Sequence, residues 1–154
     1  MSLSNIHFIL VRPQMGEIPK YITIHTYDVS VKKSSSGEIV SAAKAQLEVD
    51  KKLSICEGEG NGPVNALDNA IRNNIDNLGK YSKYLKDLKL VDYKVRILNT
   101  GTNATTRVSI ESTDRDGKSW FTIGVSPNII EASFKALIDS LDYKLYKEKA
   151  PANN

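Results

Sequence analysis

The glycine-rich segment Glu57-Gly58-Glu59-Gly60-Asn61-Gly62-Pro63 is the first candidate for chemistry, because helical periodicity begins directly after it. Backbone N–H groups at a helix N-terminus attract anions, so the segment could cradle a phosphate. Its flanking glutamates, its lack of lysine and its mismatch to G-x-G-x-x-G argue against that role. Local physics favours a tight strand-to-helix turn. A third interpretation keeps both roles: the N–H groups of Gly62, Val64 and Asn65 hold a single carboxylate.

Residue types that perform catalysis are sparse and scattered. His7 and His25 have no His, Cys or carboxylate partner at metal-ligand spacing. Cys56 falls in a predicted strand, where cysteine typically acts as a small buried hydrophobe. Asp114 and Asp116 are paired acids, but Asp-x-Asp-Gly is first of all a turn sequence. Neither a Gly-x-Ser-x-Gly elbow nor a Walker-type ending is present. We therefore expect a chain that is not an enzyme by itself, with no catalytic residue, metal site or cofactor.

Composition points to an ordinary globular protein. The 154 residues suit one domain, or one domain of two similar halves, with 40% apolar and 25% charged residues. The net charge of +3 is modest, and lysines alternate with acids, unlike the concentrated basic face of nucleic-acid-binding proteins. No apolar run approaches the ~20 residues that span a bilayer. With one cysteine, we expect a cytoplasmic protein without a nucleic-acid or membrane partner.

The elements that would position these residues follow a regular order in the first half. We expect residues 1–20 to be an irregular lead-in or linker, with regular structure beginning at Tyr21. Period-2 patterns predict strands over 21–31, 43–49 and from Leu53 onward. Pro63 then suits the first position of a helix and Gly79 its C-terminal stop. The predicted apolar face of that helix comprises Val64, Leu67, Ile71, Ile75 and Leu78.

The second half repeats this order. Alternation predicts strands at 93–97, 106–110 and 120–124, with a turn at 114–117 between the last two. Ser126 is the expected N-cap of a second helix and Pro127 its first residue. Gly60-x-x-Pro63 and Gly124-x-x-Pro127 thus mark the same strand-to-helix junction. The apolar face of this helix is expected to comprise Ile130, Phe134, Leu137 and Leu141.

The sequence therefore predicts an α+β fold of two βββα units, each with an antiparallel three-stranded sheet and one helix. We place these repeats at 21–79 and 90–146, within a domain of residues 21–146, and expect a flexible tail at 147–154. A three-stranded sheet with a helix on one face buries only one side well. Packing of two units, or of a unit on a partner chain, would cover the remaining apolar surface, so we expect a dimer.

Read as a whole, Glu57 to Ile71 resembles the signature of the C-terminal regulatory domain of 2-isopropylmalate and citramalate synthases. The resemblance continues through 90–96, Gly101-Thr102-Asn103-Ala104 and 120–133, and covers most of residues 21–145. The closing stretch, 131–145, is more similar to the citramalate synthase branch. The resemblance implies a dimer that binds an end-product amino acid for feedback inhibition. The parent enzyme, of which such a domain is one part, condenses acetyl-CoA with a 2-keto acid in a divalent-metal-dependent TIM barrel. A barrel of that size cannot fit in this chain.

The resemblance also implies an effector site. Isoleucine is the first candidate effector, for a parent that uses pyruvate, and leucine is the second. The helix N-terminus would receive the α-carboxylate, and Asp92 would pair with the ammonium group. Ordinary core packing is the alternative for each apolar member. A purely structural dimerisation domain and a nucleotide- or nucleic-acid-binding module are the competing functions. The implied residues are Gly60, Asn61, Gly62, Pro63, Val64, Asn65, Leu90 (placed before the strand), Asp92, Tyr93, Ile97, Ala104, Thr106, Pro127 and Ile129.

Overall fold

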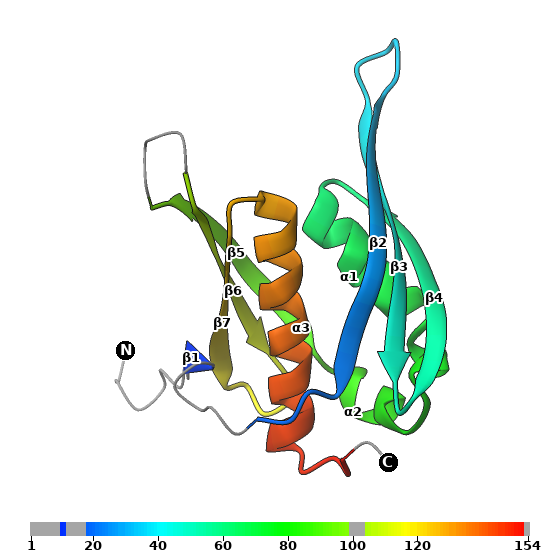
Figure 1. The fold of residues 1–154 in the computed structure, drawn as a ribbon, viewed down its shortest axis with the longest axis vertical. Helices are drawn as coiled ribbons and strands as arrows, with labels where there is room; N and C mark the ends of the chain where they lie inside the picture. The colour runs from blue at the N-terminus through cyan, green and yellow to red at the C-terminus, as the bar shows by residue number, and fades with distance from the viewer. Residues whose placement is uncertain (1–9, 12–17, 99–103, 153–154) are drawn as a thin grey trace. The chain divides into compact units, whose positions relative to one another are not determined.

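The computed structural model describes residues 10–11, 18–98 and 104–152. The chain divides into two compact units. The N-terminal unit comprises Lys20–Lys86 with Ala150–Asn154, and the C-terminal unit comprises Asp87–Lys149 with Met1–Pro19. Each unit holds three consecutive antiparallel strands followed by a helix, which confirms the predicted α+β fold of two βββα units (Figure 1). None of the helices in these ranges is long and apolar enough to cross a membrane.

The sheet of the N-terminal unit is an antiparallel meander. Its strands are β2 (Ile22–Lys33), β3 (Ile39–Val49) and β4 (Lys52–Gly60), in that order. The alternation predicted for β3 is confirmed, since every second side chain is buried. The β2–β3 hairpin extends past the end of α1 (Figure 1). Its turn uses Gly37 at φ +93°, a left-handed conformation that glycine adopts without steric cost. The buried residues of β3 are Ser41, Ala43, Ala45, Leu47 and Val49.

Helix α1 (Pro63–Asn73) packs on β3 and β4 and begins at Pro63, as predicted. It ends six residues before Gly79, so the predicted C-terminal stop is wrong. A 3₁₀ segment, η2 (Ile75–Tyr81), and α2 (Ser82–Leu85) follow. The N–H of Asn74 bonds to Ile71 O and its side chain to Ala70 O, which closes the last turn of α1. Apolar spacing continues through η2, so periodicity alone could not locate this end.

Glycines on β4 allow the helix to approach the strand closely. A Cβ atom at Gly60 would lie 2.8 Å from the backbone nitrogen of Ala66. One at Gly58 would lie 2.6 Å from the Cα of Ala70. The two alanines are four residues apart and share a helix face. Small residues on both elements therefore place backbone against backbone, and side chains at either glycine would displace α1.

The C-terminal unit has a four-stranded sheet in the order β1-β7-β6-β5. Strands β5 (Lys89–Ile97), β6 (Thr106–Thr113) and β7 (Ser119–Ser126) form the predicted antiparallel meander. Strand β1 (Leu10–Val11) pairs in parallel with β7. Regular structure therefore begins before Tyr21, and the prediction of an entirely irregular lead-in is wrong. A two-residue strand is too short for alternation to reveal it in the sequence.

Helix α3 (Ile129–Lys147) packs on β6 and β7 (Figure 1). The predicted N-cap, Ser126, is wrong: Ser126 is the last residue of β7, and Pro127 precedes the helix. Asn128 is the N-cap, and its side chain accepts hydrogen bonds from the N–H groups of Ile130 at 2.8 Å and Glu131 at 3.1 Å. Asparagine and serine cap helices equally well, so residue type alone did not exclude Ser126. The predicted apolar face is buried at Phe134, Leu137 and Leu141.

The two strand-to-helix junctions repeat one packing device. A Cβ atom at Gly124, on β7, would lie 2.9 Å from the backbone nitrogen of Ala136 on α3. The glycine common to Gly60-x-x-Pro63 and Gly124-x-x-Pro127 therefore marks a close helix–strand approach in both units. The junctions differ in length, because α1 begins at its proline and α3 begins two residues after Pro127.

Part of the predicted tail is held by hydrogen bonds within the N-terminal unit. The Tyr21 hydroxyl donates to Ala150 O at 3.1 Å, and the Tyr81 hydroxyl donates to Pro151 O at 2.7 Å. The rings of Tyr21 and Tyr81 also meet edge to face at 5.2 Å.

Candidate effector-binding site

The N-terminus of α1 presents open backbone donors. Its N-cap, Gly62, has extended backbone angles (φ −153°, ψ 175°) and no capping side chain, and the first turn carries no acid. Pro63 has no N–H, and the N–H of Ala66 bonds to Gly62 O at 2.9 Å. Among the described residues, none accepts a hydrogen bond from the N–H groups of Val64 or Asn65. Two free donors at the positive end of a helix dipole suit one carboxylate.

The side chain of Asn65 shapes the glycine-rich turn. Its Oδ1 accepts hydrogen bonds from Asn61 N at 3.2 Å and from Asn69 Nδ2 at 3.4 Å. The same Asn69 amide donates to Glu59 O at 2.7 Å. The segment is therefore the tight strand-to-helix turn that its residue types favour. This turn leaves the N–H groups of the first helical turn open. A turn and a carboxylate site are compatible in this geometry.

A β-bulge in β5 brings the predicted wall residues of the C-terminal unit onto one face. The register shifts between Leu90 and Asp92. Leu90 and Tyr93, three residues apart, therefore point to the same side of the strand as Ile97. Leu90 lies within β5, so its predicted place before the strand is wrong. The β6 partners of the three wall residues are all buried on the side covered by α3: Ser112, Ile110 and Thr106.

Asp92 points to the other face of β5. It pairs in register with Glu111, on the side of the sheet away from α3. Its carboxylate accepts a hydrogen bond from the N–H of Tyr93 at 2.9 Å and lies 3.6 Å from the Lys94 ammonium. The structure does not bring Asp92 to the face that carries Tyr93 and Ile97. We therefore leave Asp92 out of the site proposed below.

Tyr93 is tied to the start of α3 by a hydroxyl that the sequence interpretation missed. The Tyr93 hydroxyl lies 2.9 Å from the Ser133 hydroxyl, which itself donates to Ile129 O at 2.7 Å. A serine within a helix commonly donates a hydrogen bond to the carbonyl four residues earlier. The spacing of Ile129 and Ser133 could therefore have predicted this hydroxyl's position. The tyrosine is 41% exposed, Ile129 45% and Ile97 63%, so an apolar, solvent-accessible wall runs along β5 and the α3 N-terminus.

The remaining wall residues lie near the same end of this sheet. Thr106 is buried and pairs with both Ile97 and Ser126, so the three form one row across the strands. Pro127 follows that row and is exposed, and Ala104 is half-buried two residues before β6. The other members of the 101–104 motif, Gly101, Thr102 and Asn103, lie outside the described residues.

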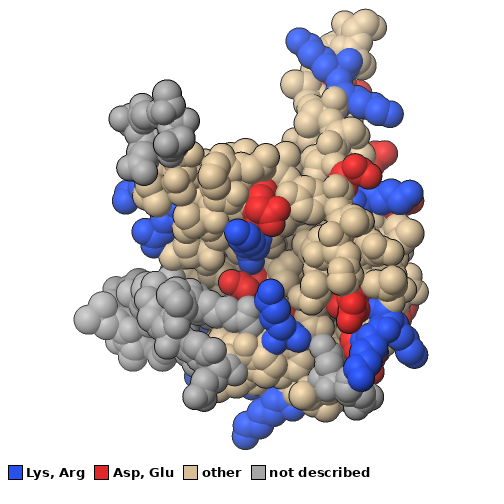
Figure 2. Space-filling view, in the orientation of Figure 1, with Lys and Arg blue, Asp and Glu red and all other residues tan. Residues whose placement is uncertain are grey.

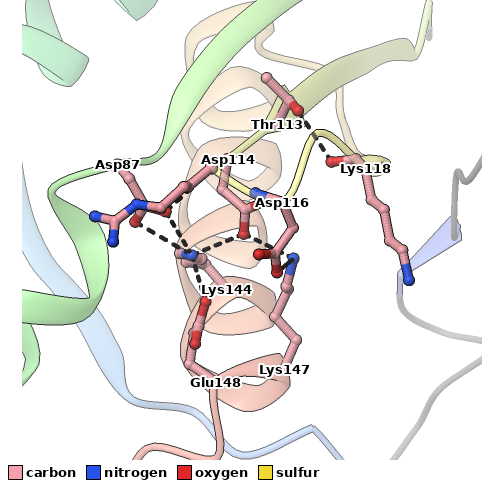
Figure 3. Close-up of polar contacts among 9 residues, drawn as sticks. Asp87, Thr113, Asp114, Asp116, Lys118, Lys144, Lys147 and Glu148 are labelled. Atoms are coloured by element: carbon pink, nitrogen blue, oxygen red, sulfur yellow. Dashed lines mark hydrogen bonds and ion pairs between the residues drawn. The ribbon is translucent and has the colours of Figure 1, made fainter.

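Three carboxylates in the C-terminal unit approach metal-ligand spacing, but lysines already contact them (Figure 3). Oxygens of Asp114, Asp116 and Glu148 lie within 4.8 Å of one another. Lys144 Nζ, 1% exposed, lies 2.7 Å from Asp114 and 2.6 Å from Glu148, and Lys147 Nζ lies 2.7 Å from Asp114. The arrangement is an ion-pair network joining the β6–β7 turn to α3.

The network shifts the pKa values of its buried members. Burial alone would raise the pKa of Asp114, but hydrogen bonds from Lys144 and Lys147 outweigh it and hold that pKa below its ordinary value. Burial alone would lower the pKa of Lys144, but hydrogen bonds to Asp114 and Glu148 raise it above the usual range. Both groups are therefore charged at neutral pH, and the network acts as structural electrostatics.

Comparison with known proteins decides the family. Residues 5–145 match the family described as LeuA allosteric (dimerisation) domain. The chain belongs to this family. The LeuA-type domain is also similar to part of the (R)-citramalate synthase of Geobacter sulfurreducens, with 40% identity over 144 residues, which is 92% of this chain and 26% of the relative. The corresponding enzyme of Aquifex aeolicus is 41% identical over the same shares.

Enzymes named 2-isopropylmalate synthase are also similar to this LeuA-type domain, at lower identity. The enzyme of Afipia carboxidovorans is 32% identical over 110 residues, or 71% of this chain and 19% of the relative. The chain spans about a quarter of the length of the citramalate synthases that it matches. The family resemblance of the glycine-rich segment and its companion motifs is thereby confirmed, and the citramalate synthase branch has the higher identity.

Proposed function

We propose that this chain is the regulatory domain of a citramalate synthase and binds isoleucine as a feedback inhibitor. The parent would condense acetyl-CoA with pyruvate, and the domain would act as a homodimer joined to the catalytic domain of the same polypeptide. The single observation that carries the proposal is the match over 92% of the chain to citramalate synthases at about 40% identity. A ligand can inhibit in this way only through different affinities for two arrangements of the domain.

Two local features support the effector chemistry. The open N–H groups of Val64 and Asn65 suit the α-carboxylate that every amino acid carries. The apolar wall along β5 and the α3 N-terminus, with Tyr93, Ile97 and Ile129, suits a branched aliphatic side chain. We propose each set separately, the N–H donors in the N-terminal unit and the wall in the C-terminal unit, and each is tested by its own variant.

The first experiment is calorimetric titration of the chain with isoleucine, leucine and valine. Isoleucine and leucine differ in the position of one methyl group, a difference typically worth only about 1–3 kcal/mol in an apolar pocket. We expect isoleucine to bind most tightly. Tighter binding of leucine would instead favour a 2-isopropylmalate synthase parent. A folded dimer that binds none of the three would favour a domain used only for dimerisation.

The second experiment tests the wall. Tyr93→Ala should weaken isoleucine binding by roughly tenfold or more, because a large partly exposed aromatic contact is lost. Tyr146→Ala is the matched control, since Tyr146 is 40% exposed and lies near the other end of α3. Circular dichroism and light scattering would check fold and dimer. Equal affinity of the two variants would overturn the assignment of Tyr93.

A further inference from the structure

A cluster of basic side chains lies on the face of the C-terminal sheet that points away from α3. In the antiparallel register, Arg96 is directly opposite Arg107, and Lys94 is directly opposite Ser109. The intervening Val108 is fully buried on the side of α3, so its neighbours Arg107 and Ser109 point to the opposite face. Lys94, Arg96, Arg107 and Ser109 therefore share one surface, which we name the basic face.

The arginine pair is an electrostatic anomaly. Like charges directly opposite each other on neighbouring strands destabilise a sheet. Among the residues that the structure describes, neither Arg96 nor Arg107 has an acidic partner within ion-pair distance. The next acids on this face, Asp92 and Glu111, are each four residues along the strand, or about 13 Å. The pair is therefore left uncompensated by the residues around it.

The surroundings of the pair also form a hollow. Its volume is about 460 Å³, and Val95 completes the lining with the four residues of the basic face. This volume is within the range of small-molecule sites, roughly 300–1,000 Å³. On the next strand, Val125 is opposite Arg107 and Ile123 is opposite Ser109, so apolar residues flank the basic face on its β7 side.

We propose that the basic face binds the phosphoryl group of a small molecule. The two guanidinium groups and the Ser109 hydroxyl present many N–H and O–H donors from two adjacent strands, and the Lys94 ammonium, 3.6 Å from Asp92, adds a third positive charge. A carboxylate offers one charge and two oxygens, which a single guanidinium satisfies. A phosphoryl group, with a charge of about −1.5 to −2 and three terminal oxygens, can accept hydrogen bonds from several side chains of the basic face at once. The site is independent of the proposed amino-acid effector site.

The charges on the chain favour a small ligand over nucleic acid. On the side of the molecule that Figure 2 shows, basic and acidic side chains are interspersed. On β5 and β6 themselves, the acidic residues Asp92 and Glu111 follow the basic face along the strands, so its positive charge does not extend further in that direction. A nucleic-acid backbone is bound along an extended basic surface. A compact group of three cations around one hollow suits a single phosphoryl group.

The test uses the intact chain with inorganic phosphate and with adenosine monophosphate, which separates free phosphate from a phosphate ester. We expect both the thermal midpoint and amide resonances near Ser109 to shift more than in sodium chloride of equal ionic strength. Acetate should produce a smaller shift. The double variant Arg96→Gln/Arg107→Gln should bind phosphate at least about tenfold more weakly. Without phosphate, its thermal midpoint should equal or exceed that of the wild type, because the repulsion is gone.

The matched control is Lys32→Gln/Lys33→Gln on β2, which removes the same charge from exposed positions of the other unit. It should retain the phosphate response, and isoleucine affinity should be unchanged in both double variants. Equal effects of phosphate and chloride, or an equal loss in the control, would overturn the proposal. Salt-sensitive binding of a single-stranded oligonucleotide without binding of the monophosphate would also overturn it, in favour of a nucleic-acid surface.

Discussion

The hydroxyl of Tyr93 donates a hydrogen bond to the hydroxyl of Ser133, 2.9 Å away. Ser133 has one proton and gives it to the carbonyl of Ile129 at 2.7 Å, so the tyrosine supplies the proton of the shared bond. The bond fixes an aromatic ring of the edge strand β5 against the first turns of α3. Ser133 itself is 1% exposed, so it acts on a ligand only through the ring that it holds.

We predict that Ser133→Ala weakens isoleucine binding while the chain stays folded. A single neutral hydrogen bond contributes about 0.5–1.5 kcal/mol, so the expected loss of affinity is roughly two- to tenfold. Ser133→Thr keeps the hydroxyl and should restore most of the affinity. Calorimetry on both variants measures the difference. Identical affinities for the alanine and threonine variants would show that the bond has no role in binding.

Replacing Lys144 should destabilise the C-terminal unit. In Lys144→Met, the fully buried carboxylate of Asp114 loses one of its two lysine partners, and Asp87 loses its 3.2 Å contact (Figure 3). Breaking a buried ion pair costs about 3–5 kcal/mol, and we expect about 3 kcal/mol because Lys147 still contacts Asp114. Lys147→Met, whose side chain is more exposed, should cost about 1 kcal/mol. Urea unfolding of both variants provides the measurement, and equal losses would contradict the central place of Lys144.

The same network predicts how stability depends on pH. The pKa values of Asp87 and Asp114 are held below 3.8, so their contribution is complete above that value and is lost as pH falls through the lowered pKa. The pKa of Lys144 is raised above 10.5, so its contribution is complete below that value and is lost as pH rises through the raised pKa. The stability difference between wild type and Lys144→Met should therefore be constant from about pH 5 to about pH 9 and shrink outside that window. A slope within it would contradict these shifts.

The sequence could predict the order of elements because each depends on short-range patterns. Alternation located β3, and the glycine before each proline marked both close helix–strand junctions. These glycines are informative because a Cβ atom at Gly60 or Gly124 would clash with the backbone of the helix, and glycine has no Cβ atom. Such positions carry one residue type for a steric reason, and a single sequence is enough to find them.

Features set by register could not be predicted in the same way. The bulge between Leu90 and Asp92 adds one residue to β5. Side chains that precede the bulge therefore point to the opposite face from the one that alternation along the strand would give them. Without the bulge, Leu90 would not share a face with Tyr93. Asp92 follows the bulge and is adjacent to Tyr93, so ordinary alternation already places it on the opposite face, and its assignment to the pocket rested on the family resemblance alone. The helix stop after Asn73 was missed for a similar reason, because a 3₁₀ segment continues nearly the same apolar spacing.

The glycine-rich turn offers a matched pair of substitutions that separates folding from binding. Gly60→Ala places a Cβ atom 2.8 Å from the Ala66 nitrogen, and overpacking of this kind costs about 1–3 kcal/mol. Gly62→Ala meets nothing within 4 Å, and its φ of −153° is open to alanine, so stability should change by less than about 0.5 kcal/mol.

The Gly62 variant then tests the carboxylate site at α1 while the fold is unchanged. An added methyl group at the N-cap lies more than 4 Å from the N–H groups of Val64 and Asn65 and leaves them in place. N-cap side chains point toward these N–H groups, so the methyl group restricts the approach of a carboxylate, and we expect isoleucine affinity to fall by roughly threefold to tenfold. Urea unfolding and calorimetric titration of the same two preparations measure both quantities. If Gly62→Ala binds isoleucine as the wild type does, the carboxylate is held elsewhere, because the variant changes nothing else near the first turn of α1.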